Sequence, residues 1–179
     1  MALGKHTDSA RGARPVDAFR QDAPVAGNRP PQNMNTRVTL SELVEALEWV
    51  SASGPYETEA YVSRASGRIW LISDLDDTQE APPEDMGDES LYLAVPGKRD
   101  LDLGRNLALR FVKAQLPEDY ERVRGYFGRA GAYGRFKDLL DERGLLEAWY
   151  AYESKEIEEA LRVWASDNDV ELIEGPDEG

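Results

Sequence analysis

The residues best suited to chemistry are two aspartates that follow an apolar segment. The strand-like run Trp70-Leu71-Ile72-Ser73 leads directly into Asp74-Leu75-Asp76-Asp77-Thr78. An aspartyl nucleophile and a hard cation held by carboxylates suit phosphoryl transfer. Asp74 and Asp76 are therefore the first candidates for such chemistry.

This run resembles the first motif of the haloacid dehalogenase-like phosphohydrolases. That resemblance implies that Asp74 attacks phosphorus, that Asp76 moves the proton and that both help to hold magnesium. It also implies that the motif lies on the first strand of a doubly wound parallel sheet. Here a predicted hairpin precedes the motif, a Pro-containing acidic loop (residues 79–90) follows it, and no later strand ends in paired acids. A phosphohydrolase using Asp74 and Asp76 therefore stays a remote alternative, and we predict no catalytic residue.

The acidic loop that follows is a second candidate for metal chemistry. Residues 74–89 contain eight carboxylates and no basic residue, and Asp76, Asp77 and Glu80 match the spacing Asp-Asp-x-x-Glu. The central Gly and final Glu of an EF-hand are missing, and no all-helical pocket is predicted around the loop. We expect a solvated acidic connection with at most weak divalent binding, and no resident metal or cofactor.

A third cluster combines glycines, cations and aromatics within residues 128–138, Gly-Arg-Ala-Gly-Ala-Tyr-Gly-Arg-Phe-Lys-Asp. A Gly-rich turn that opens a helix presents free N–H groups, and nearby cations can complete an anion pocket. The structural alternative is that the glycines let two helices meet at a tight corner, that Tyr133 and Phe136 enter the core, and that Asp138 pairs with a cation. The candidate partner- or ligand-binding residues are Gly128, Arg129, Gly131, Tyr133, Arg135, Lys137, Asp138, Trp149 and Tyr150.

This motif, with the Trp149 and Tyr150 helix that follows it, resembles the bacterial group called uncharacterised protein family 0158. The resemblance covers residues 37–173. It implies no reaction, and it implies that the acidic loop joins one strand to another. Positions 133 and 134 are commonly Phe and Arg in that pattern but are Tyr133 and Gly134 here, so no cationic role is expected at position 134.

Composition excludes several classes of site. The chain of 179 residues has no cysteine, and its one histidine is His6, which argues against disulfides, thiolate zinc sites and Ser-His-Asp triads in the folded part. The net charge is −14, with an acidic excess of 16 in residues 37–179. This charge disfavours general nucleic-acid binding and anionic lipid, and it favours either simple solubility or a cationic partner.

Local patterns in the sequence predict the helices and strands that position these residues. Thr39 and Glu42 form a capping box for a helix that ends at Gly54-Pro55. A hairpin is predicted from residues 59–64 and 68–73, and a third strand from residues 91–95. Helical periodicity then continues through Leu103, Phe111, Tyr120, Phe127, Phe136, Leu140, Leu146 and Trp164, before a short strand at residues 170–173. The predicted class is α+β: a small antiparallel sheet packed with about five helices, mostly in the C-terminal half.

The expected organisation has three parts. Residues 1–36 form a disordered extension, residues 37–174 a single α+β domain, and residues 175–179 a flexible acidic tail. No stretch approaches the length of a membrane span, so a soluble cytoplasmic protein is expected. We predict a non-catalytic protein-interaction or regulatory binding module, with a protein partner that its charge favours as cationic. The alternative is a small-anion or phosphate-ligand binder at the 128–138 corner.

Overall fold

The computed structural model describes residues 36–52, 56–74 and 81–175, all of which belong to one unit, Asn33–Gly179. Its first helix, α1 (Leu40–Ser51), begins at the expected capping box: the Thr39 side chain accepts a hydrogen bond from the Glu42 N–H, and the Glu42 carboxylate accepts one from the Thr39 N–H. Leu43, Ala46 and Leu47 form its buried face. The local signal therefore fixes where the helix starts.

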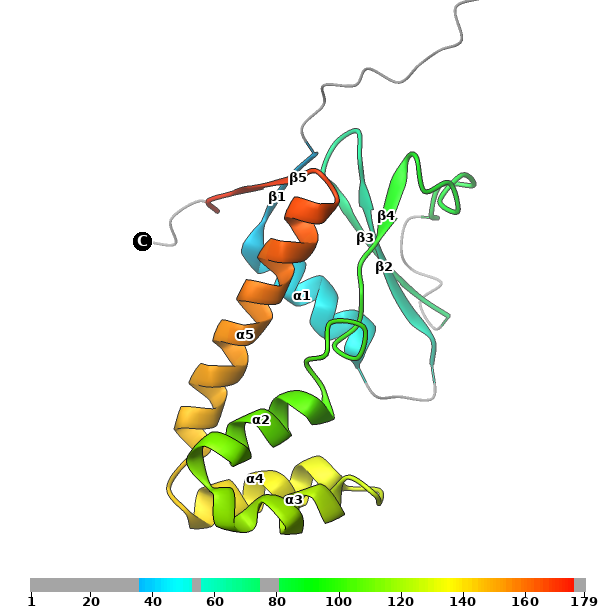
Figure 1. Cartoon of the computed structure of the whole chain (residues 1–179). Coiled ribbons are helices and arrows are strands. Elements are labelled where there is room, and N and C mark those ends of the chain that lie inside the picture. Colours follow the sequence, from blue (N-terminus) through cyan, green and yellow to red (C-terminus); the bar gives the residue numbers. More distant parts are fainter. Residues whose placement is uncertain (1–35, 53–55, 75–80, 176–179) are drawn as a thin grey trace, which may run out of the picture. The chain divides into compact units, whose positions relative to one another are not determined.

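Helix α1 covers one face of a three-stranded antiparallel sheet (Figure 1). The strands are β2 (Thr58–Ser63), β3 (Ile69–Ser73) and β4 (Tyr92–Ala94), in the order β3-β2-β4. Ala60, Val62 and Leu93 are buried, and Val62 pairs with Leu93 across the sheet. Because alternate residues of a strand point to opposite faces, this register places the three on the same side. The predicted hairpin and third strand are confirmed.

A parallel pair of short strands joins the two ends of the described chain. Strand β1 (Thr36–Thr39) pairs with β5 (Val170–Ile173). A strand at residues 170–173 was predicted from the sequence, but its partner was not, and β1 begins at the last residue assigned to the expected extension. Thr36 is buried, and its hydroxyl donates a hydrogen bond to the carbonyl of Arg64 at 2.9 Å. The hairpin therefore supports β1 from the side.

The helices of the C-terminal half pack on one another and on the long last helix. They are α2 (Arg105–Gln115), a 3₁₀ turn (Pro117–Asp119), α3 (Tyr120–Tyr126), α4 (Ala132–Glu142) and α5 (Leu146–Asp167). Helix α2 contacts α3, α3 contacts α4, and α5 contacts α1, α2, α4 and β5. With α1 these make the five α-helices expected, so the α+β class is confirmed.

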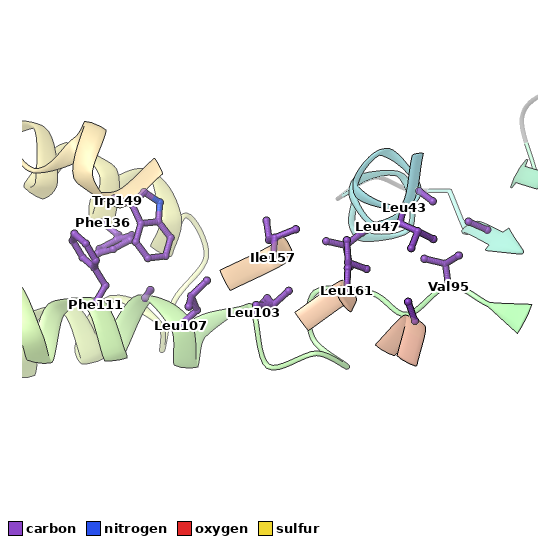
Figure 2. Packing of buried hydrophobic residues seen from close by; sticks show 14 of the residues in the cluster. Leu43, Leu47, Val95, Leu103, Leu107, Phe111, Phe136, Trp149, Ile157 and Leu161 are labelled. Carbon is purple, nitrogen blue, oxygen red and sulfur yellow. The ribbon is translucent and has the colours of Figure 1, made fainter. Parts of the chain in front are cut away.

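One hydrophobic cluster runs along α5 and connects the sheet side to the helical side (Figure 2). Leu161 lies near Leu43 and Leu47 of α1 at one end, while Phe136 and Trp149 lie together at the other. The Phe136 and Trp149 rings are 4.9 Å apart in an edge-to-face arrangement. Helix α5 thus supports both the sheet side and the helical side. The chain passes from one side to the other through the segment that joins β4 to α2.

Candidate ligand-binding groove

The corner at residues 128–138 is a helix junction built on glycine. Helix α3 is capped by Phe127, and α4 starts after Gly131, which has φ of +74° and serves as the N-cap. A side chain at Gly131 would meet no atom within 4 Å, so the left-handed backbone, and not crowding, is what favours glycine there. The cap has no side-chain hydrogen bond. This agrees with the structural interpretation of the glycines.

Helix α4 divides the candidate residues between the core and the surface. Phe136 is fully buried, whereas Arg135 and Asp138 are exposed. Tyr133 is 42% exposed and does not enter the core; its ring meets Phe127 edge-on, with centroids 5.1 Å apart. Within the described residues Asp138 has no ion pair, in contrast to the pairing expected in the structural interpretation. Most of the motif therefore faces solvent, with Phe136 as its anchor.

The two aromatics of the following helix have different roles. Trp149 is only 1% exposed and lies between Phe111 and Phe136, so it contributes to packing and cannot touch a ligand. Among the residues that the structure describes, its indole N–H finds no hydrogen-bond acceptor. Tyr150 is 39% exposed, and the Lys137 ammonium lies 5.2 Å from the centre of its ring. Of this pair, only Tyr150 is placed for recognition, next to Lys137 of α4.

Tyr133 and Lys137 line a groove of about 1110 Å³ that extends beyond the predicted site. Its opposite wall is formed by residues 97–106, which run from the β4–α2 connection into the first residues of α2, and by residues 50–52 at the end of α1. Phe127 and Glu153 contribute from α3 and α5. The sequence-based prediction missed the 97–106 wall, although three cations (Lys98, Arg99 and Arg105) in a Gly-containing segment of an acidic chain were a usable signal.

The connecting segment is held in one conformation by its own hydrogen bonds. The Leu103 N–H donates to the Lys98 carbonyl at 2.7 Å, and the Gly97 N–H donates to the Asp100 carboxylate at 2.9 Å. The Lys98 N–H donates to the Ser51 hydroxyl at 2.8 Å, which ties the segment to α1. Asp102 adopts a positive φ of 57°. This wall is therefore preorganised, which is typical of binding loops on a rigid scaffold.

Two acids of the groove, Asp102 and Glu153, are paired with cations, whereas the Asp100 carboxylate has no cationic partner among the described residues and accepts the Gly97 N–H. The Asp102 carboxylate accepts hydrogen bonds from the Asn106 amide at 2.6 Å and from the Arg110 guanidinium at 2.7 Å, and these two bonds lower the pKa of Asp102. The Lys98 ammonium lies 3.6 Å from the Glu153 carboxylate and 2.7 Å from that of Glu48. Neither Asp102 nor Glu153 is therefore an unpaired charge.

Three cations of the groove have no such partner. Elsewhere many cations are paired, for example Arg37 with Glu171 and Arg143 with Asp119. Arg99, Arg105 and Lys137 line the groove, and their side chains have neither an ion pair nor a hydrogen bond to any residue that the structure describes. The same holds for Lys113, Arg129 and Arg135, of which the last two belong to the adjoining corner. Against these three unpaired cations the described part of the groove has one acid without a cationic partner, Asp100, so an excess of positive charge is left in an acidic protein.

The Tyr133 hydroxyl reaches across the groove to the start of α2. A Cβ at Gly104, the N-cap residue, would lie 3.7 Å from that oxygen. The backbone N–H groups of Arg105 and Asn106 have no acceptor within the described residues, because α2 begins without a side-chain cap. Burial raises the pKa of Tyr133, and Glu153 raises it further, while Arg99 acts in the opposite direction. The phenol is therefore neutral and available as a donor.

The acidic candidates lie elsewhere in the fold. Asp74 is exposed directly after β3, which belongs to an antiparallel sheet and not to the parallel sheet that the phosphohydrolase resemblance implies. Asp76, Asp77 and Glu80 lie outside the described residues. Within residues 36–52, 56–74 and 81–175, no three His, Cys, Asp or Glu side chains gather closely enough to hold a metal ion. The sheet context thus argues against the phosphohydrolase reading.

None of the described helices combines the length and apolar character of a membrane span. Comparison with known proteins adds no relative: no protein-family model matches the chain, and no curated protein or solved structure is detectably similar to it. The resemblance to uncharacterised protein family 0158 accordingly stays a prediction that depends on the 128–138 motif and its following helix.

Proposed function

We propose that this chain is a non-catalytic, cytoplasmic binding module that holds a negatively charged ligand in the groove between residues 97–106 and α4. The observation that carries this proposal is the set of uncompensated cations, Arg99, Arg105 and Lys137, on one groove. In a chain of net charge −14, acidic partners for these side chains are abundant. Leaving three cations unpaired at one place is what a site for an external anion requires.

The neutral donors of the groove support the same ligand chemistry. The Tyr133 hydroxyl, near Gly104, is close to the uncapped start of α2, where the N–H groups of Arg105 and Asn106 are free. Such N–H groups and the positive end of a helix dipole favour carboxylate or phosphate oxygens. A ligand oxyanion here would receive hydrogen bonds as well as charge compensation, which gives orientation in addition to attraction.

A second candidate function, docking of a partner protein, is favoured by the exposed aromatics beside the groove. Tyr133 and Tyr150 are among the most exposed large apolar side chains of the described chain, and Lys137 lies against Tyr150. Tyr and Arg are the residue types enriched in interface hot spots. The cations of this face favour an acidic segment of such a partner, whereas the overall charge of the chain favours a basic one.

The proposal is tested by thermal unfolding in the presence of small anions. Phosphate, pyrophosphate and citrate, each added at low ionic strength, should raise the melting temperature, because a ligand that binds only the folded state stabilises it. Arg105→Ala and Lys137→Ala should lose most of this shift while melting normally without ligand. Lys113→Ala is the matched control, since Lys113 is an exposed, unpaired cation of α2 outside the groove.

Two results would contradict the proposal. One is that no anion of this set changes the melting temperature of the wild-type protein. The other is that Lys113→Ala reduces the shift as much as Arg105→Ala does, because the effect would then report nonspecific charge and not this groove. Capture of a partner protein that persists in Arg105→Ala and Lys137→Ala but is lost in Tyr150→Ala would favour the second candidate function.

A further inference from the structure

We infer that the ligand of this groove is a polyanion, a molecule with two or more phosphate or carboxylate groups that contact both walls at once. This inference rests on the proposed function and specifies the class of ligand. Arg99 belongs to the β4–α2 connection and Arg105 is the first residue of α2, whereas Lys137 belongs to α4. Because these cations come from two walls, a ligand with several anionic groups can meet more of them at once than a single small anion can.

The two walls share α5 as a support but have no direct polar link to each other among the described residues. The β4–α2 segment is tied to α1 through the Lys98 N–H and the Ser51 hydroxyl, and to both α1 and α5 through the Lys98 ion pairs with Glu48 and Glu153. Helix α4 packs on α3 and α5. No hydrogen bond or ion pair connects α4 to residues 97–106 in the part of the chain that the structure describes. A ligand that reaches both walls would supply the missing polar link.

The dimensions of the groove favour the same class. Sites for small organic ligands commonly have volumes of about 300 to 1000 Å³, and this groove, at about 1110 Å³, is slightly larger than that range. One orthophosphate ion would leave most of it to water. A larger molecule with spaced anionic groups can fill it while each group meets a cation.

Glu153 limits where those anionic groups can lie. Its carboxylate lines the groove and contributes to the raised pKa of Tyr133, so it lies near the phenol. Lys98, 3.6 Å away, offsets part of this negative charge, and the remainder repels an anionic group placed next to the carboxylate. Replacing this carboxylate by the uncharged amide of Gln should therefore strengthen the binding of a polyanion, a gain of function that loss of folding cannot imitate.

The experiment is calorimetric titration of the full chain with orthophosphate, pyrophosphate and tripolyphosphate, which share one chemistry and increase in charge and length. We expect tripolyphosphate to bind at least about tenfold more tightly than orthophosphate, since each added contact is a charge-assisted hydrogen bond. Arg105→Gln and Lys137→Gln should each weaken tripolyphosphate binding about tenfold, and Glu153→Gln should tighten it about threefold or more. Lys113→Gln is the control, and citrate tests carboxylates in place of phosphates.

The outcomes separate this inference from the proposed function. The inference of a polyanion that contacts both walls is wrong if orthophosphate binds in the groove as tightly as tripolyphosphate, or if Lys137→Gln has no effect while Arg105→Gln abolishes binding. In either case the proposed anion site itself is still supported. If neither the phosphates nor citrate bind the wild-type protein, both are wrong. If Lys113→Gln weakens tripolyphosphate binding as strongly as Lys137→Gln, the attraction is nonspecific and the inference is overturned.

Discussion

Replacing Gly67 by alanine tests whether β1 is an integral part of this fold. Gly67 lies in the β2–β3 turn at φ of +74°, and a Cβ there would be 2.0 Å from the backbone carbonyl oxygen of Arg37, within β1. No side chain can rotate to relieve this contact, because both partners are backbone or Cβ atoms. Either the turn or β1 must move.

The expected cost has two parts. Alanine in the left-handed region costs about 1 to 2 kcal/mol. Displacing β1 would in addition disturb the hydrogen bond from Thr36 to Arg64, with a net value of about 1 kcal/mol, and the burial of Val38, worth about 1.5 to 3 kcal/mol if lost completely. We therefore expect Gly67→Ala to lower the free energy of unfolding by about 3 to 6 kcal/mol.

Gly144→Ala provides the matched control. Gly144 follows the end of α4 at φ of +66°, and a Cβ there would meet no atom within 4 Å. This variant should pay the conformational cost alone, about 1 to 2 kcal/mol. Both variants restrict the unfolded chain in the same way, so that effect cancels in the comparison. Urea denaturation of the two variants and the wild-type protein measures the difference.

A difference of about 2 kcal/mol or more between the two glycines would show that the turn packs directly on β1. If Gly67→Ala costs no more than Gly144→Ala, the close approach of Gly67 to Arg37 contributes nothing, and β1 is not supported by the hairpin. The parallel pairing of β1 with β5 would then have to be stable alone, which is unusual for two strands.

Three further predictions concern the aromatic side chains. Phe136→Ala should lower the free energy of unfolding, measured by urea denaturation, by about 3 to 5 kcal/mol, since the ring is fully buried. Arg135→Ala, a change at the exposed neighbouring position, should lower it by less than about 1 kcal/mol. Equal losses would contradict the assignment of Phe136 to the core. Trp149→Phe should change the free energy of unfolding by only about 1 kcal/mol, because the loss of buried ring area is offset by the removal of a buried N–H that has no acceptor among the described residues. A loss as large as that of Phe136→Ala would show that this N–H has a partner. The pKa of Tyr133 is raised by burial, so the folded protein keeps a proton that the unfolded chain releases above about pH 10. The free energy of unfolding should therefore fall as the pH rises through that range. A Tyr133→Phe variant in which this alkaline decline is unchanged would contradict the prediction.

The sequence by itself determined the local features of this protein. The start of α1 follows from Thr39 and Glu42, which satisfy each other's backbone N–H groups without help from the rest of the chain. The β2–β3 hairpin follows from two β-prone runs around a short Gly-containing turn. Gly131 was expected at a helix junction, and its positive φ is the reason a glycine suits it. In each case the interacting residues are close in the chain, so their identities carry the information.

Only the tertiary structure decided the features that join distant residues. Strand β1 has four residues, too few for a hydrophobic period, and it becomes a strand because β5 and the hairpin turn meet it. Trp149 has the residue type of a binding aromatic, but the rings of Phe111 and Phe136 enclose it. The groove likewise depends on the packing of α5, which places the 97–106 segment opposite Tyr133 and Lys137. Burial and charge pairing are properties of neighbours in space, and the order of residues along the chain does not specify them.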